Sequence, residues 1–195
     1  MRQRRARTRC AALAAAALAT LTALAGLCAS AADEPPSPVT VGVEHKGDVY
    51  IVVASFIAPV VPADAWAVLT DFDNMASFMP TLTSSRVLQR AEGRVLVQQR
   101  GRMELGTFKM PFESDRMIEM SPPDVIHSRQ VRGNMQRVDS TTAFVAVPGG
   151  TRIDYRVEMV PKLWMPESVA QPLLHTEIER QFTAILREII RRKGN

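Results

Sequence analysis

The sequence predicts an α+β domain, with strands and helices in separate stretches of the chain. Residues 152–159 alternate strictly between charged and apolar side chains, which is typical of a strand with one solvated and one buried face. Near the C-terminus, apolar residues recur every three or four positions, which is typical of one long amphipathic helix. Stretches rich in valine and isoleucine, with turn residues between them, fill much of the remaining chain.

The folded part is expected to begin with two strands. Residues 39–44 and 49–57 are rich in valine and isoleucine, and the turn residues 46–48 separate them. This pattern predicts a strand pair with a tight connection. Pro59 and Pro62 end the second strand, and Pro62 suits the first position of a helix.

A short helix is expected next, over residues 63–70, with Trp66 and Leu69 on one side. Residues 71–74 (Asp-Phe-Asp-Asn) are expected to break it. Residues 75–79 predict a further helical turn, which ends at the proline that follows.

From Ser84 to Val160 the pattern predicts strands joined by short connections, and therefore a mainly antiparallel meander. Gln99 interrupts the apolar face of one of them, where it lies in phase with Val95, Val97 and Met103. Besides residues 152–159, the expected strands are residues 94–105, 108–120, 125–131 and 137–147.

The last segment changes to a helical period. Pro172 is placed near the start of this helix or at a kink before it, and Arg191 and Arg192 suit its C-terminal end. The apolar stripe consists of Leu174, Ile178, Phe182, Ile185 and Ile189.

Residues 1–32 are interpreted as an export signal. Five arginines precede an apolar run over residues 11–27, and Ala29-Ser30-Ala31 has the small side chains of a cleavage site. Retention of this segment as an uncleaved anchor is the alternative. We expect an exported protein, periplasmic or secreted, with an acidic, proline-rich linker at residues 33–38 and a single domain at 39–195.

The composition of the chain without this leader excludes some functions. The whole chain has 24 basic and 20 acidic residues; without the five leader arginines it has 19 basic residues and a net charge of −1. This balance argues against nucleic-acid binding. Both cysteines, Cys10 and Cys28, also lie in the leader, so no disulfide is expected in the domain.

Residues 62–88 resemble the START-like helix-grip superfamily, the group of polyketide cyclase/dehydrase and coenzyme Q-binding proteins. The matching residues are Trp66, Thr70-Asp71 followed by Phe72, and Phe78-Met79-Pro80. A second matching region is Gly149-Gly150-Thr151-Arg152, with the alternating strand that follows and the last helix. The resemblance covers roughly residues 48–192.

The resemblance implies a helix-grip fold, in which a curved antiparallel sheet wraps around the C-terminal helix and leaves an apolar cavity. Methionine side chains adapt well to irregular apolar ligands, although core packing is the simpler role for most methionines of the domain. The candidates for the cavity lining are Trp66, Met75, Phe78, Met79, Gln99, Met103, Tyr155, Val157, Met159, Trp164, Ile178, Phe182 and Ile185.

Candidate catalytic groups are few, and the sequence has no nucleophile motif or phosphate-binding glycine loop. An enzyme would use His127, Arg129, Gln99 and Asp71, whose convergence in one pocket would be the deciding observation. A turn-forming role for Asp71 and structural roles for His127 and Gln99 are the alternatives. His45 is expected at the surface, and His175 with Glu179 has no third metal ligand, so neither a metal site nor a cofactor is expected.

The leading hypothesis is an exported, non-enzymatic protein that binds a hydrophobic small molecule, such as a lipid, an isoprenoid quinone or a polyketide-like compound. A cyclase or dehydratase that uses the same cavity is the alternative, and a protein-interaction module with a collapsed cavity is a third reading. A transient membrane contact is a further expectation. The sequence predicts neither the ligand nor the oligomeric state.

Overall fold

The computed structural model describes residues 38–105, 108–162 and 166–194. The predicted leader lies outside the described residues, as does all of the predicted linker except Pro38. The described elements are β1 Thr40–Lys46, β2 Val49–Ala58, α1 Pro62–Leu69, the 3-10 helix η1 Phe72–Ser77, β3 Leu82–Ala91, β4 Arg94–Leu105, β5 Phe108–Ser121, β6 Val125–Gly133, β7 Met135–Val147, β8 Gly150–Pro161 and α2 Glu167–Lys193.

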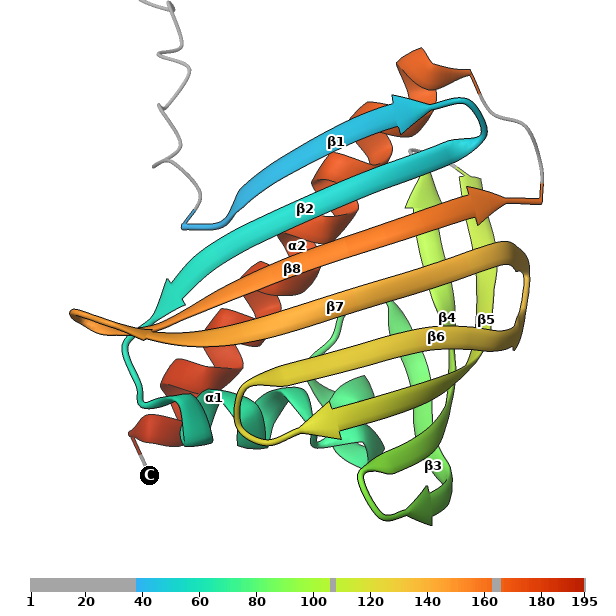
Figure 1. Cartoon of the computed structure of the whole chain (residues 1–195). Helices are drawn as coiled ribbons and strands as arrows, with labels where there is room; N and C mark the ends of the chain where they lie inside the picture. Colours follow the sequence, from blue (N-terminus) through green and yellow to red (C-terminus); the bar gives the residue numbers. More distant parts are fainter. Residues whose placement is uncertain (1–37, 106–107, 163–165, 195) are drawn as a thin grey trace, which may run out of the picture. The chain divides into compact units, whose positions relative to one another are not determined.

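The described strands form one antiparallel sheet of eight strands in the order β1-β2-β8-β7-β6-β5-β4-β3. The sheet curves around α2, while α1 and η1 lie near the C-terminal end of that helix (Figure 1). The predicted α+β class and the helix-grip architecture are therefore confirmed.

The alternation predicted for residues 152–159 is observed in β8. Ile153 and Val157 are buried on the concave face of the sheet, and Tyr155 is half-buried beside them. Arg152 and Arg156 are exposed on the convex face. Strand geometry thus divides the sheet into a core-facing side and a solvated side.

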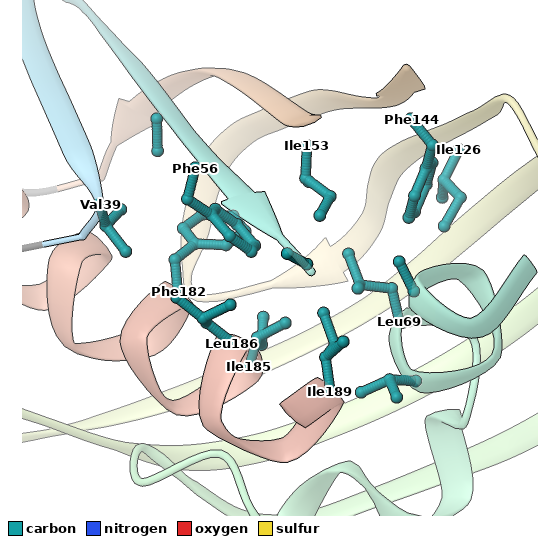
Figure 2. Close-up of a cluster of buried hydrophobic side chains, with 14 of the residues drawn as sticks. Val39, Phe56, Leu69, Ile126, Phe144, Ile153, Phe182, Ile185, Leu186 and Ile189 are labelled. Carbon is teal, nitrogen blue, oxygen red and sulfur yellow. The ribbon is translucent and has the colours of Figure 1, made fainter. Parts of the chain in front are cut away.

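The apolar core lies between the concave face and α2, as Figure 2 shows. Phe182 of α2 packs against Phe56 of β2, with ring centroids 5.6 Å apart. Ile185 and Ile189 continue this contact towards Leu69 of α1, and each of these side chains is at least nine-tenths buried. The predicted apolar stripe is thus the face of α2 that contacts the sheet.

The helical turn predicted at residues 75–79 begins earlier than expected. The 3-10 helix η1 starts at Phe72, inside the segment expected to break the preceding helix. Phe72 is 4% exposed, and its burial draws this segment against the core. Main-chain bonds from Phe78 and Met79 to the Met75 carbonyl then close the end of η1.

Helix α2 begins at Glu167, so that Pro172 lies inside the helix close to its start. Pro166 occupies the N-cap position, and its carbonyl accepts the main-chain N–H groups of Val169 and Ala170. The prediction placed Pro172 near the start or at a kink before the helix, and the helix extends over it.

Gly150 shows why the second family-like region has its sequence. Its φ is +151°, and a Cβ there would lie 2.0 Å from the Ala58 carbonyl oxygen, so only glycine fits. The next residue, Thr151, is fully buried and donates a hydrogen bond of 2.7 Å to the Val60 carbonyl. This region therefore fastens the start of β8 to the connection between β2 and α1.

Within the described residues, no helix has both the length and the apolar character needed to cross a membrane.

Candidate ligand cavity

A cavity of about 170 Å³ lies between the concave face of the sheet, η1 and the middle of α2. Its lining combines residues from helices and strands that are far apart in the sequence. They are Leu69, Phe72, Met75, Met79, Thr81, Leu82, Gln99, Phe112, Arg116, Ile118, Ile126, Ser128, Ser140, Thr142, Tyr155, Gln181, Phe182 and Ile185.

The helical side of the cavity is largely apolar. Phe182 and Ile185 project from α2, while Phe72 and Met75 come from η1 and Met79 lies two residues beyond it. Phe72, Phe182 and Ile185 are buried in the core, so they form a fixed wall. The two thioether side chains are flexible and polarizable, which suits contact with ligands of irregular shape.

Gln99 of β4 lines the cavity and is buried. Its amide nitrogen lies 3.3 Å from the Met75 sulfur and 3.4 Å from the Ser85 hydroxyl oxygen, and donates to both. These contacts join β4 to β3 and to η1. Its nitrogen is thus already engaged within the fold, as the structural alternative expected.

Hydroxyl groups and one arginine make the opposite side of the cavity polar. Arg116 of β5 donates a hydrogen bond of 2.9 Å from Nη2 to the Ser140 hydroxyl of β7. The Nε atom of Arg116 and the hydroxyl of Ser128 are sealed from solvent, and neither has a hydrogen-bond partner among the described residues. Buried donors usually have partners, so these two atoms call for an explanation.

Tyr155 of β8 adds a phenol to this polar side. Burial raises the pKa of Tyr155, while the charge of Arg116 and hydrogen bonds with Ser140 and Arg116 oppose that rise. The net direction is upward, so the phenol stays protonated at neutral pH and has a proton that it can donate. Its ring packs against Phe182 with a centroid distance of 4.8 Å, which places Tyr155 at the boundary between the polar and apolar sides.

The structure brings some of the predicted cavity residues together and separates others. Met75, Met79, Gln99, Tyr155, Phe182 and Ile185 line the cavity. The side chain of Met103, and Trp164 as a whole, lie outside the part of the chain that the structure describes. The remaining five predicted residues lie elsewhere in the described fold: Trp66, Phe78, Val157, Met159 and Ile178.

These five residues lie outside the lining because each has another packing partner or position. Trp66 packs against Phe144, with ring centroids 5.3 Å apart, and Phe78 lies beneath the guanidinium of Arg192 at 5.6 Å. The others belong to the surrounding apolar core, either further along β8 or earlier in α2: Val157, Met159 and Ile178.

The four catalytic candidates do not converge. Gln99 lies in the cavity, whereas His127 and Arg129 lie on the convex face, in a separate pocket of about 330 Å³ lined mainly by polar and charged groups. His127 is hydrogen-bonded there to Thr141 at 3.1 Å. Asp71 pairs with Arg192 at the C-terminal end of α2.

The other two histidines make local contacts away from the cavity. His45, expected at the surface, is half-buried, stacks on Tyr50 at 4.2 Å and lies 3.3 Å from the Glu167 carboxylate. His175 and Glu179 lie 3.7 Å apart on α2. Within the described residues, no three potential metal ligands lie close enough together to hold an ion.

Arg116 is the functional candidate that the sequence analysis missed. It lies in phase with Phe112 and Ile118 on the concave face, and this signal is present in the sequence. The signal was obscured because Met117 and Glu119 on the other phase also mix apolar and charged character. An arginine in phase with apolar residues of a strand is, in retrospect, the mark of a charged group directed into the core.

The chain belongs to the family described as polyketide cyclase / dehydrase and lipid transport, whose family model matches residues 58–186. The match extends from the end of β2 into the last third of α2 and so includes every described element that lines the cavity. No curated protein is significantly similar in sequence to this chain.

Solved structures with this fold include proteins of different described roles. A STAR-related lipid transfer protein from Xanthomonas axonopodis is 12% identical with a TM-score of 0.67, over 80% of this chain and 96% of that one. The Zhui aromatase/cyclase from Streptomyces is 17% identical with a TM-score of 0.59, over 74% and 95% of the two chains. A START superfamily protein from Mycobacterium smegmatis is 15% identical with a TM-score of 0.61, over 72% and 97%. At these identities the likeness shows the fold alone.

Proposed function

We propose that this protein binds a hydrophobic small molecule in the cavity between α2 and the concave face of the sheet. The observation that carries the proposal is the cavity itself, since it combines a fixed apolar wall with a polar side of hydroxyl groups and one arginine. Ligand sites of this kind are largely apolar with a few polar groups that set orientation. Membership of a family that includes lipid transport supports the same reading.

The driving force would be the transfer of apolar ligand surface out of water. Each buried methylene group contributes about 0.8 kcal/mol before the costs of association are subtracted. Phe182 and Ile185 offer a wall that is already packed, so little ordering is needed when a ligand enters. The lining residues named for the cavity are the proposed ligand contacts.

Export is part of the proposal. Residues 1–32 would direct the chain across the membrane, and residues 39–195 would act as a single domain in the periplasm or outside the cell. The ligand would then belong to the envelope or the surroundings of the cell.

A cyclase-type enzyme is the second candidate, favoured by Arg116 and Tyr155 in one cavity. A cationic donor beside a protonated phenol can stabilise an enolate oxygen and deliver a proton. Turnover of a bound compound, detected by mass spectrometry of the released product, would favour the enzyme; recovery of an unchanged compound would favour the binding protein.

The direct experiment is native mass spectrometry of the purified protein, followed by extraction and identification of whatever remains bound. A discrete hydrophobic molecule at one-to-one stoichiometry supports the proposal. A protein that is empty, and that binds no member of a panel of fatty acids, quinones and aromatic compounds, contradicts it.

Two substitutions on α2 form a matched pair for this experiment. Ile178 and Ile185 are both 6% exposed, but only Ile185 lines the cavity. We expect Ile185→Phe to reduce ligand occupancy strongly and Ile178→Phe to leave it near the native value, at a similar cost in stability. Equal occupancy in the two variants would show that the ligand lies elsewhere.

A further inference from the structure

Arg116 is a cation in a cavity that supplies no countercharge. Among the described residues, no carboxylate lies within ion-pair distance of Arg116, and none lines the cavity. Arg152 and Arg156 of the convex face, by contrast, pair with Asp154 and Glu158, each at 2.8 Å. A charge that faces a cavity of low polarity is unfavourable unless it is paired.

The groups around Arg116 are hydrogen-bond donors or can act as donors. Ser140 accepts from Arg116, and Ser128 has a buried hydroxyl with no partner among the described residues. Tyr155 is a protonated phenol on the same side of the cavity. A guanidinium surrounded by hydroxyl groups is suited to a group that has several acceptor oxygens and carries negative charge.

We propose that the ligand is an amphiphilic carboxylic acid, whose carboxylate pairs with Arg116 while its apolar body lies against Phe72, Phe182 and Ile185. The inference rests on the proposed function and specifies the chemical class of its ligand. A carboxylate is favoured over a neutral carbonyl because it presents two oxygens to the planar fork of the guanidinium and neutralises its charge. Arg116 lines the cavity, so a carboxylate there would supply the countercharge that no described lining residue provides.

The test uses matched probes that differ only in the head group: 2-naphthoate and 2-naphthamide, with decanoate and decanol as an aliphatic pair. Affinities are measured by calorimetry at pH 7 on the purified native protein. We expect each carboxylate to bind at least about 10-fold more tightly than its neutral partner, since charge-assisted hydrogen bonds are about twice as strong as neutral ones. Equal affinities within either pair would overturn the carboxylate proposal while leaving the cavity as a binding site.

Variants locate the preference at one side chain. Arg116→Gln should abolish the preference for the carboxylates, while Arg116→Lys should keep part of it. Arg187 is exposed on α2, so Arg187→Gln is the matched control and should keep the native preference. A preference that survives in Arg116→Gln would overturn the assignment.

Acid titration of the native protein gives a test that needs no variant. The affinity for 2-naphthoate should fall as the pH drops through the range in which its carboxylic acid becomes protonated, while the affinity for 2-naphthamide stays flat. Parallel profiles would contradict the proposal. If no probe binds and nothing is extracted from the purified protein, the proposed function fails and the ligand class fails with it.

Discussion

Arg116 and Arg192 are two partly buried arginines in very different surroundings. Arg192, at the C-terminal end of α2, donates to Asp71 and to Glu188 at 2.7 Å each, and its guanidinium lies over the Phe78 ring. Arg116 donates to a serine hydroxyl and leaves its Nε atom without a partner among the described residues. The guanidinium of Arg192 pairs with two carboxylates of the fold. The guanidinium of Arg116 has no carboxylate partner among the described residues.

This difference assigns different roles to the two ends of the domain. The Arg192 contacts tie the start of η1 to the end of α2, so they fix one wall of the cavity. Arg116, by contrast, lines the space that this wall encloses, on its polar side. Removal of the Arg192 charge should therefore lower the stability of the fold, whereas removal of the Arg116 charge should weaken ligand binding.

Replacement of Arg192 should have the largest effect on stability. Arg192→Met leaves Glu188, which is 8% exposed, with one arginine partner fewer, and leaves Asp71 without its ion pair. We expect a loss of about 2 kcal/mol in the free energy of unfolding, below the 3–5 kcal/mol typical of fully buried pairs because Arg192 is itself partly solvated. Urea unfolding of the native protein and of Arg192→Met measures this loss.

Arg187→Met is the control for this comparison, because Arg187 is exposed on the same helix. It should change the free energy of unfolding by less than about 0.5 kcal/mol. An equal effect of the two substitutions would show that the contacts of Arg192 contribute nothing specific.

Glu188 links this stability to pH. Hydrogen bonds from Arg191 are the main cause that lowers the pKa of Glu188 from 4.5 to about 2, with Arg192 adding to the effect against the opposing influence of burial. Because the folded-state pKa lies below the unfolded value, the stabilisation is fully present above about pH 4.5 and is lost as the pH falls towards 2. Glu188→Gln should therefore lower the free energy of unfolding by about 1–2 kcal/mol at pH 7, a value reduced for the solvent exposure of both arginines.

The pH dependence separates this mechanism from a simple packing defect. Urea unfolding of the native protein and Glu188→Gln should give curves that approach each other between pH 4.5 and pH 2. A difference that stays constant over this range would show that the Glu188 charge is not its cause.

The fold was largely predictable because its strongest signals are periodic. The alternation along β8 and the apolar stripe of α2 each repeat over many residues, so local sequence is sufficient to assign their type and their buried faces. The start of η1 was not predictable from local sequence, because the burial of Phe72 depends on contacts with parts of the chain that follow it much later. Local turn chemistry therefore misplaced this short element by three residues.

The cavity was predictable only in part, because its lining depends on which position along each element faces the gap. Ile178 and Ile185 belong to the same stripe, yet only Ile185 lines the cavity. Phe78 lies in the family-like stretch, yet it packs under Arg192. The fold family supplied the expectation of a cavity, and the three-dimensional packing decides its members.

The phenol oxygen of Tyr155 should contribute less to the free energy of unfolding than Asp71 or Glu188, the two partners of Arg192. Tyr155→Phe keeps the ring that packs on Phe182 and removes only the phenol oxygen. We expect a change of less than about 1 kcal/mol in the free energy of unfolding and a several-fold weaker affinity for 2-naphthoate. A loss of 3 kcal/mol or more would mean that the phenol is a structural hydrogen-bonding group, and the polar side of the cavity would need another interpretation.

The central claim is that Arg116 is held in the cavity for a ligand rather than for the fold. Thermal unfolding of the native protein and of Arg116→Met, each with and without 2-naphthoate, tests it most directly. The account predicts that Arg116→Met without ligand unfolds at the native temperature or above it, because an apolar side chain replaces an uncompensated charge. It also predicts that 2-naphthoate raises the unfolding temperature of the native protein more than that of Arg116→Met. Unfolding of Arg116→Met far below the native temperature, with the shift caused by 2-naphthoate retained, would contradict the claim.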